Sequence, residues 1–544
     1  MKNITIVFKD YNIFSGFSQA ALHSGIIIKR ACLKMKKFIC IFAVLMIFMA
    51  LAAAGCKKEP AVLTVEIFNR GTDGGRTTAY DNAWTSWIKN KVKKDLNIEV
   101  TFVPVDYWPE DTLIENLMAS GNAPDLCYTY SGDMIAKFRE QGILLDLAPY
   151  INNRLPDLKK LLGDDPAFPG RDFIYRNADP QTRKIYSIHS YRTSLAQRNI
   201  FIRKDWLDKI NFPLPTNIDE FYNALIAFRD RDPGGVKRNN VVPLCASDTG
   251  MGLSSFINHF IDTDLSDRDR WLYDIYERRL MMPGFKEGVR LMNQWYYELL
   301  INEDFPLTAD EDFNSRIKSG VAGAFCQNWD YPYRQDYKIN EELAANIPGA
   351  EFVPVDIFQN KEMMDKSGLH IFIPSFSKNH KAALRYLNWL AKPENYHFLQ
   401  FGQEGVNHTI VNGVPSTIER QAGDPWFMNS ANNIDYTMPM NGAETGNPEL
   451  NARVLASSYG NTPPDVIVNA YMISTRNARA AAVYQAAASV NQYARILQDK
   501  ADLLIAQAIR CNPRDFDQIW DDGIKDWLAS GGQEVINERA SLYK

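Results

Sequence analysis

Alternating and helical patterns of apolar residues predict a β-α-β unit that starts near residue 63. Residues 63–71 (LTVEIFNRG) alternate as a strand does, an amphipathic helix follows within 78–100, and residues 98–105 (IEVTFVPV) form a second strand. Two such strands are expected to pair in parallel through a right-handed crossover. A further helix leads to a short buried strand at 126–130. Open α/β sheets of this kind bind ligands beyond the carboxyl ends of their strands.

The middle and the end of the chain are predicted to be mostly helical, with a few buried strands between the helices. One helix is expected to begin with Thr216 as its N-cap and Asp219 three residues later, and its apolar residues fall on one face. Residues 319–335 contain a buried strand that is followed by a polar and aromatic loop. Residues 368–402 predict a strand, a loop and two helices, and the tail from residue 476 is helical.

An uncharged apolar segment, residues 38–55, precedes the α/β pattern. Basic residues lie before it and small residues end it, which is typical of a secretory signal peptide over residues 35–55. A transmembrane anchor is the alternative, because a segment of this length just spans a bilayer. Residues 1–34 are interpreted as an over-called upstream segment.

A single cysteine closes the apolar segment. The sequence Ala53-Ala54-Gly55-Cys56 resembles a bacterial lipobox, although Leu, Val or Ile is commoner than alanine at its first position. The resemblance implies cleavage before Cys56, acylation of this cysteine, and a tether over residues 56–62. Because each buried CH₂ contributes about 0.8 kcal/mol, several acyl chains anchor a protein stably. We therefore expect a lipid-anchored protein outside the cytoplasmic membrane.

Composition, charge and cysteine spacing exclude several classes of protein. The content of 46% hydrophobic and 23% charged residues is that of a globular protein. A net charge of -5 without a basic stripe gives no sign of a nucleic-acid partner. The cysteines beyond Cys56 lack C-x-x-C or metal-like spacing and are expected to be free thiols, with a disulfide as the alternative. They are Cys127, Cys245, Cys326 and Cys511.

Several stretches resemble, in their order and spacing, the family 1 extracellular solute-binding proteins of ATP-driven importers, in a long lipoprotein branch. They include SGNAPDLCYTYSG, GILLDLAPYI, IRKDWLDKINFPLPTNIDEFYNALIAFRDRDP, SFSKNHKAALRYLNWL and FGQEGVNHTIVNGVP. The resemblance implies an α/β, type II periplasmic-binding-protein-like fold: two lobes, each a mixed sheet flanked by helices, joined by a hinge of crossing strands. The expected parts are 63–203 in lobe 1, 204–345 in lobe 2, 346–420 returning to lobe 1, and a helical 421–544 mainly in lobe 2.

The same resemblance implies capture of a carbohydrate, an oligosaccharide or a uronide, in a cleft between the lobes. The solute would be delivered to the permease subunits of an ABC importer by a monomer that needs no cofactor. A secreted carbohydrate-active enzyme is one alternative, since aromatic and carboxylate groups also build hydrolase clefts. A ligand-sensing partner of a membrane receptor is another. The sequence contains no H-E-x-x-H, G-x-S-x-G or Walker motif that would indicate other chemistry.

Candidate ligand groups follow the predicted strand in AFCQNWDY. An aromatic ring covers the apolar face of a sugar, and polar side chains satisfy its hydroxyls, each of which costs about 1–3 kcal/mol if buried without a partner. Trp329 is the first candidate, because resemblance to maltose-binding proteins implies a stacking tryptophan in this loop. A structural tryptophan at the strand end is the alternative. The expected contact residues are Gln327, Asn328, Trp329 and Asp330.

Lobe 1 is expected to supply a second group of contacts at its strand ends. The Arg70 guanidinium could bind a carboxylate through two hydrogen bonds, which favours an acidic sugar as the ligand. The alternative is that the Arg70 side chain is simply solvated. Trp108 stands before a proline, where a packing role is equally supported. Asp125 is expected to cap local backbone and Arg203 to form a hinge salt bridge. The predicted contacts in this lobe are Asn69, Arg70, Trp108, Tyr128, Tyr130, Ser131 and Asp133, with His189 and Tyr191 on the hinge side.

The loop DPGGVKRNNVV (232–242) departs from the branch that the chain resembles. Many members carry an EF-hand-like acidic loop there, whereas the expected oxygen-ligand positions in this chain are occupied by Gly234, Val236, Asn240 and Val241. Calcium takes six to eight oxygen ligands, so we predict no metal at this loop. The acidic residues 262–269 (DTDLSDRD) are predicted to form a solvated surface loop.

Overall fold

The computed structural model describes residues 59–542 with short gaps. The gaps are residues 72–74, 108, 164–172, 176, 180–181, 248–251, 276–277, 335–336, 359–360, 363, 412, 419, 428–433, 443–444, 446, 457–458, 461, 477 and 480–486. Residues 61–544 form one compact unit. The predicted signal peptide and Cys56 lie outside the described residues. None of the described helices is long and apolar enough to cross a bilayer.

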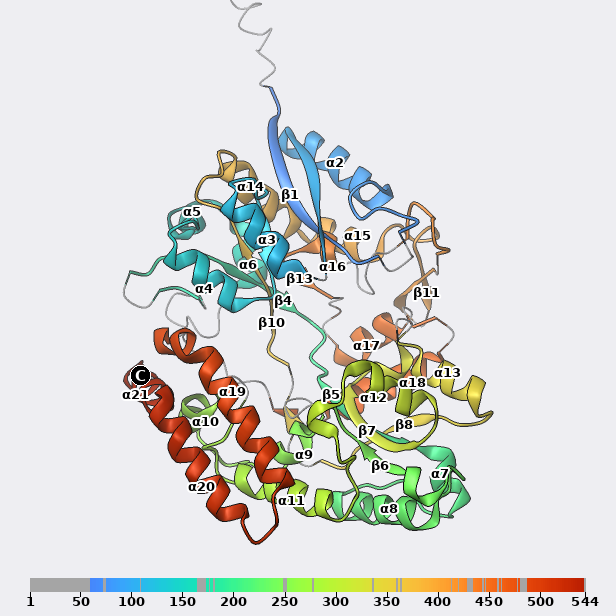
Figure 1. The fold of residues 1–544 in the computed structure, drawn as a ribbon. Coiled ribbons are helices and arrows are strands. Elements are labelled where there is room, and N and C mark those ends of the chain that lie inside the picture. The colour runs from blue at the N-terminus through green and yellow to red at the C-terminus, as the bar shows by residue number, and fades with distance from the viewer. Residues whose placement is uncertain are drawn as a thin grey trace, which may run out of the picture. The chain divides into compact units, whose positions relative to one another are not determined.

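The first lobe begins with the predicted β-α-β unit, which is confirmed. Strand β1 (Ala61–Asn69) pairs in parallel with β2 (Ile98–Asp106), and α2 (Ala83–Leu96) joins them (Figure 1). Helix α2 starts in a capping box, in which Asn82 accepts a hydrogen bond from the Thr85 N–H and Thr85 accepts one from the Asn82 N–H. Its buried face packs into the core of this lobe, so local signals were sufficient to define the unit.

A four-stranded mixed sheet completes lobe 1, in the order β13-β4-β10-β3. Strand β10 is antiparallel to both β3 and β4, and β13 is parallel to β4. The strands are β3 (Cys127–Thr129), β4 (Ile188–Arg192), β10 (Ser367–Phe372) and β13 (Met440–Asn441). The lobe also contains α3 (Glu110–Ala119), α4 (Gly132–Glu140), α5 (Ala148–Arg154), α6 (Pro156–Leu162), α14 (His380–Leu390), α15 (Pro393–Phe401) and α16 (Ile434–Thr437).

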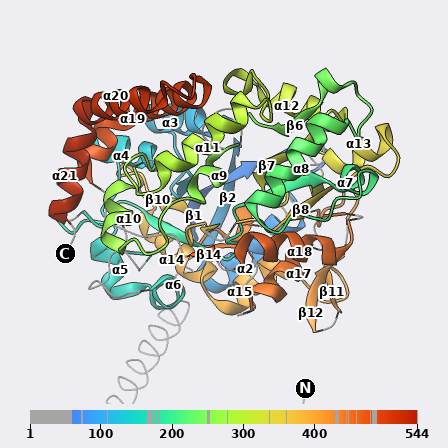
Figure 2. The same cartoon turned by 90° about the horizontal axis from the view of Figure 1, so that it is seen from below.

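The second lobe is built on another mixed sheet, in the order β6-β7-β5-β8. Strand β7 is parallel to β6 and antiparallel to β5, which is also antiparallel to β8. The strands are β5 (Arg198–Arg203), β6 (Val242–Cys245), β7 (Ala322–Asn328) and β8 (Phe352–Val355). The helices of this lobe are α7 (Lys204–Lys209), α8 (Ile218–Arg231), α9 (Ser254–Asn258), α10 (Asp267–Tyr273), α11 (Phe285–Tyr297), α12 (Asp310–Lys318), α13 (Ile339–Asn346), α17 (Pro448–Ala456) and α18 (Pro464–Thr475), followed by three C-terminal helices. Figure 2 shows α17 and α18 side by side.

Two crossing segments lead from one lobe to the other, residues 193–197 between β4 and β5 and residues 356–366 between β8 and β10, and backbone hydrogen bonds hold them in place. The Met364 N–H donates to the Leu195 carbonyl, and the Thr193 N–H donates to the Asn441 carbonyl. A two-stranded parallel ribbon, β9 (Lys361–Glu362) with β14 (Ala478–Arg479), lies in the same region. A hairpin of β11 (His408–Val411) and β12 (Val414–Thr417) completes the strands of the described residues.

Strand pairing places the lobe boundaries differently from the sequence-based division. Residues 198–203 were expected in lobe 1, yet β5 is a central strand of the lobe 2 sheet. Residues 352–355 were expected in the return to lobe 1, yet β8 pairs with β5. Residues 434–441, expected in the C-terminal part, join lobe 1 because β13 pairs with β4. Each shift has the same cause, which is pairing between strands far apart in the sequence.

The predicted N-cap of α8 is wrong by one residue. The N-cap is Asn217 rather than Thr216: the Asn217 backbone is extended, and its side chain accepts the Glu220 N–H at 2.9 Å. The Glu220 carboxylate in turn accepts the Thr216 N–H and hydroxyl, so it bonds to the residue before the N-cap and not to the N-cap itself. The predicted buried stripe is confirmed at Phe221, Leu225 and Phe228, each fully buried.

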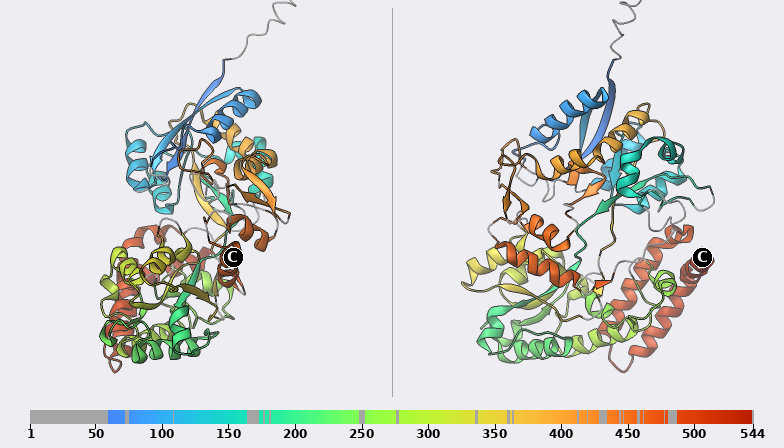
Figure 3. Two further views of the ribbon diagram at one scale, coloured as in Figure 1. Left: turned by 90° about the vertical axis from the view of Figure 1, so that its right-hand side faces the viewer. Right: turned by 180° about the vertical axis from the view of Figure 1, so that it is seen from behind.

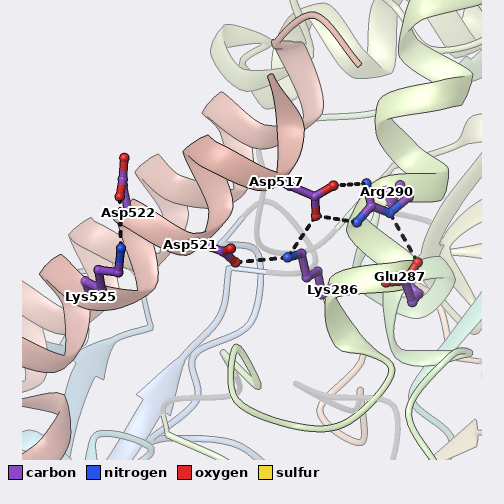
Figure 4. A network of polar contacts seen from close by, with 7 residues as sticks. All are labelled: Lys286, Glu287, Arg290, Asp517, Asp521, Asp522 and Lys525. Carbon is purple, nitrogen blue, oxygen red and sulfur yellow. Dashed lines mark hydrogen bonds and ion pairs between the residues drawn. The ribbon is translucent and has the colours of Figure 1, made fainter. Parts of the chain in front are cut away.

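The C-terminal helices α19 (Ala488–Arg510), α20 (Phe516–Trp527) and α21 (Gln533–Leu542) pack together, coloured red in Figure 3. Ion pairs join α20 to α11: Arg290 to Asp517 at 2.7 Å, and Lys286 to both Asp517 and Asp521 at 2.9 Å (Figure 4). Hydrogen bonds from Arg290 and Lys286 lower the pKa of Asp517 to about 2, so the network stays charged at neutral pH. These helices therefore belong to lobe 2.

The four cysteines beyond Cys56 are free thiols, as expected. Cys127, Cys245 and Cys326 are buried, and Cys511 is half-buried. Burial raises the pKa of the Cys245 thiol to about 12. At neutral pH this thiol is therefore protonated and unreactive.

Candidate ligand-binding site

The strand end that the sequence singled out lies at the rim of the lobe 2 sheet. Asn328, the last residue of β7, pairs with Arg198, the first residue of β5. Asn328 is exposed and Gln327 is half-buried, so both present polar groups at this rim. The Gln327 side-chain oxygen accepts the Asn328 N–H at 2.9 Å, which fixes the turn out of the strand.

Trp329 turns inward from the same strand end. Its side chain is 6% exposed and lies edge-on to the rings of Tyr471 and Tyr459, with centroids 5.3 and 6.0 Å away. The Trp329 backbone N–H donates to the Gln197 carbonyl, and the neighbouring Asp330 carboxylate accepts a hydrogen bond from the Tyr459 hydroxyl at 2.6 Å. Packing of Trp329 at the strand end is thus a role that it performs in this structure, whereas its contact with a ligand stays a prediction.

Arg70 lies at the end of β1, where it forms a bidentate ion pair with Asp435 of α16. Both nitrogen–oxygen distances are 2.9 Å, and the two side chains are 14% and 1% exposed. Burial alone would lower the pKa of Arg70, but attraction to Asp435 raises it above its ordinary value. The guanidinium also lies 4.1 Å from the centroid of the Tyr107 ring. Arg70 is therefore not solvated, and the nitrogens that would fork onto a ligand carboxylate already bind Asp435.

Aromatic rings surround this ion pair, and Tyr128 is one of them. The Tyr128 ring is fully buried against Phe68, and its hydroxyl accepts the Phe68 N–H at 2.9 Å. In this structure the Tyr128 side chain supports the cluster from inside, and its contact with a ligand stays a prediction. Tyr130 is half-buried, and its hydroxyl lies 3.5 Å from the Asn441 amide nitrogen. The structure thus brings Arg70 and Tyr130 into one cluster.

Most of the other predicted contacts in lobe 1 have local partners. The Asn69 amide donates to Asp106 at 2.8 Å. Ser131 is the N-cap of α4 and accepts the Met134 N–H, while the following Asp133 is exposed in the first turn. Trp108 lies outside the described residues.

The two hinge-side candidates sit on β4. His189 is buried, with its ring 4.2 Å from that of His370 and its Nε2 2.6 Å from the Asn177 amide. Tyr191 is half-buried and packs edge-on against Phe173 at 5.5 Å. These side chains stabilise the sheet next to the crossing segments.

Asp125 and Arg203 have structural roles that differ from those expected, which were a local backbone cap for Asp125 and a hinge salt bridge for Arg203. Asp125 accepts the Thr64 N–H at 3.0 Å and the Ser377 hydroxyl at 2.7 Å, so it ties together segments far apart in the chain. Burial alone would raise the pKa of Asp125, but these hydrogen bonds lower it. Arg203 is fully buried and pairs with Asp205 at 2.8 Å at the start of α7, which places this salt bridge inside lobe 2 rather than at the hinge.

A polar cavity of about 50 Å³ opens beside Arg198 in lobe 2. Residues from separate segments line it: the start of β5, helices α9 and α10, and the ribbon of β9 and β14. We call this space the basic cavity, because five cationic side chains line it and none of its described lining residues is acidic. The five are Arg198, Arg270, Arg279, Lys361 and Arg479.

Sequence reasoning missed the basic cavity completely. Its cations are separated by long stretches of chain and do not form a run or a periodic pattern. The available signal was the position of Arg198 at the start of a strand, and that strand was assigned to the other lobe. Within the described residues, no group of three or more His, Cys, Asp or Glu side chains is placed to hold a metal ion.

Comparison with known proteins gives a consistent family. The model of the bacterial extracellular solute-binding protein family matches residues 74–397. The chain is 23% identical to the polygalacturonan/rhamnogalacturonan-binding protein YtcQ of Bacillus subtilis (strain 168) over 470 residues, which are 82% of this chain and 85% of YtcQ.

Solved structures show the same fold at lower sequence identity. The alginate-binding protein AlgQ2 without calcium ion has a TM-score of 0.57 and 17% identity, over 90% of this chain and 98% of AlgQ2. An HMO-binding, ABC-transporter-associated solute-binding protein from Bifidobacterium longum infantis has a TM-score of 0.59 and 15% identity, over 89% and 98% of the two chains. The type II periplasmic-binding-protein-like fold is confirmed. Since the family model covers more than half of the residues, this chain belongs to the bacterial extracellular solute-binding protein family.

Proposed function

We propose that this protein captures a carbohydrate and delivers it to the permease subunits of an ABC importer. The observation that carries the proposal is the family match across residues 74–397, which include strands of both lobes. The relationship to YtcQ over most of the chain supports an oligosaccharide or uronide as the solute. The protein acts as a monomer held outside the cytoplasmic membrane by acylated Cys56.

The proposed site uses polar and aromatic groups at the strand ends of both lobes. In lobe 2, Gln327 and Asn328 offer hydrogen bonds beside the basic cavity, and Trp329 lies directly behind them. In lobe 1, the half-buried Tyr130 presents a ring next to the Arg70 ion pair. A ligand that contacts both groups binds the closed arrangement more tightly than the open one, and this difference drives closure.

The protein is expected to bind saccharides without converting them. Titration calorimetry with neutral oligosaccharides and uronides should give micromolar affinity, about -8 kcal/mol, for at least one of them. Chromatography after prolonged incubation should recover that saccharide unchanged. A new reducing end would identify an enzyme, and absence of binding to every saccharide would refute the proposal.

Trp329→Ala is expected to weaken binding of that saccharide by more than about tenfold, since an aromatic pair contributes about 0.5–1.5 kcal/mol beyond the area it buries. Trp329 also packs against Tyr459 and Tyr471, so urea denaturation must show that the variant is folded at the assay temperature. Trp329→Phe keeps a ring in the same place and serves as the control, with a smaller expected loss. Unchanged affinity of the alanine variant would remove Trp329 from the site.

A further inference from the structure

Five cationic side chains crowd around the basic cavity, although like charges repel one another. Three of them are largely withdrawn from water, with side-chain exposures of 12% for Arg270 and 11% for Arg279 and Lys361. Holding charged groups in so small and shielded a space is unfavourable unless negative charge compensates for it. The cavity therefore has the electrostatics of an anion-binding site.

Carboxylates outside the cavity compensate for some of these cations. Asp274 contacts Arg279 at 3.1 Å, and Asp356 contacts Lys361 at 2.7 Å. Asp267 lies 3.6 Å from Arg270 but is 73% exposed, and exposed pairs are weak. None of the three lines the cavity.

Arg479 is the cation best placed to receive a ligand. It ends the short strand β14, which pairs with β9 so that Ala478 lies opposite Lys361 and Arg479 lies opposite Glu362. Arg479 is half-buried, and it takes part in no ion pair between side chains that the structure describes. A planar guanidinium of this kind binds a carboxylate through two parallel hydrogen bonds.

Another part of the lining is apolar and lies beside polar residues such as Ser255 and Asn258. The Phe358 ring is half-buried, and the side chains of Ile261 and Met282 are buried beside it. Apolar groups of this kind suit the C–H face of a sugar ring and offer nothing to an inorganic ion. The volume of about 50 Å³ fits a carboxylate and the ring atoms next to it rather than a whole oligosaccharide.

We propose that the basic cavity binds the carboxylate of an acidic oligosaccharide, that is, of one uronic-acid residue, and that Arg479 is the side chain that pairs with it. The inference rests on the proposed function and specifies its ligand. The cavity lies beside Arg198, which pairs with Asn328, so the remaining sugar residues extend toward the polar rim at the end of β7. The inference thereby assigns recognition of the ligand carboxylate to lobe 2. It does not assign it to Arg70, because the Arg70 guanidinium already binds Asp435.

The test compares three probes on the purified protein by titration calorimetry: a uronic-acid trisaccharide, its methyl ester, and the neutral trisaccharide of the same linkage. We expect the acid to bind about 10- to 100-fold more tightly than the ester, the range of a charge-assisted hydrogen-bonded pair. Arg479→Gln should remove most of this preference, because it should weaken binding of the acid far more than binding of the neutral trisaccharide. The affinity for the acid should also fall with increasing salt.

Arg476→Gln is the matched control, because Arg476 lies three residues away, is 54% exposed, and contacts Asp356 without lining the cavity. It should leave the preference for the acid intact. Equal affinity for acid and ester in the wild type, or an unchanged preference in Arg479→Gln, would overturn the inference and leave the proposed function in place. An equal thermal shift with inorganic phosphate would assign the cavity to a free anion instead. Failure of all three saccharides to bind would refute the proposed function itself, and with it this inference.

Discussion

Replacing Arg70 by methionine is expected to lower the free energy of unfolding by about 3–5 kcal/mol, the range found when one partner of a buried ion pair is removed. The change would leave the Asp435 carboxylate, 1% exposed, without its bidentate guanidinium partner. It would also remove the cation–π contact with Tyr107. Since the pair joins residues 365 positions apart, its loss should loosen the attachment of α16 to the end of β1. Urea denaturation measures the effect as a lower midpoint at unchanged slope.

The double variant Arg70→Met with Asp435→Leu provides the control. A buried ion pair can be replaced by apolar side chains of similar size at little cost, so the double variant should recover most of the lost stability. Recovery would show that the single variant suffers from an unpaired buried charge and not from lost packing. A single variant that loses less than about 1 kcal/mol would contradict the buried ion pair, because that is the value of an exposed one.

Gly288→Ala is expected to destabilise the protein by about 2–3 kcal/mol, even though alanine favours helices by about 1 kcal/mol over glycine. Gly288 lies where α11 crosses α9, and a Cβ there would meet the carbonyl oxygen of Ile257 at 2.3 Å and its Cα at 2.6 Å. Backbone cannot rotate away from such a contact, so the helices must separate. Since α9 carries Ser255 and Asn258 into the lining of the basic cavity, the affinity for an acidic saccharide should fall as well.

Gly523→Ala in α20 is the matched comparison. A Cβ at Gly523 would also have a contact of 2.3 Å, but with Cδ1 of Leu504, the end of a flexible side chain. The leucine can change rotamer, and alanine gains helix propensity, so we expect a change within about 1 kcal/mol of zero. Thermal unfolding of both variants measures the two changes in stability. An equal loss of stability in the two variants would contradict the idea that Gly288 is needed for the close approach of the two helix backbones.

The predictable parts of this structure are those encoded by neighbouring residues. The alternation in 63–71 and the helix after it defined β1, α2 and β2, including their parallel pairing. The stripe of Phe221, Leu225 and Phe228 defined the buried face of α8, whereas its N-cap was displaced by one residue because Thr216 and Asn217 both have capping side chains. Boundaries of elements depend on such near-equal choices and are therefore less certain than the elements themselves.

The candidate site was predictable only where its residues follow a strand directly. Gln327 and Asn328 do lie at the accessible end of β7, but a sequence pattern does not tell whether the next side chain faces outward, and Trp329 packs inward between two tyrosines. Arg70 was recognised as a strand-end cation, while its partner lies 365 residues later. No pattern in the sequence around Arg70 predicts an ion-pair partner so far along the chain.

The sequence by itself determined the class of this protein, the identity of its main strands and helices, and the polar rim of lobe 2, because backbone periodicity and turn residues act over a few positions. Tertiary structure decided which lobe β5, β8 and β13 join, which charge Arg70 binds, and where five cations meet in the basic cavity. These outcomes depend on packing and electrostatics between residues that are remote in the chain, and the free energy of such contacts exists only once the fold has brought them together.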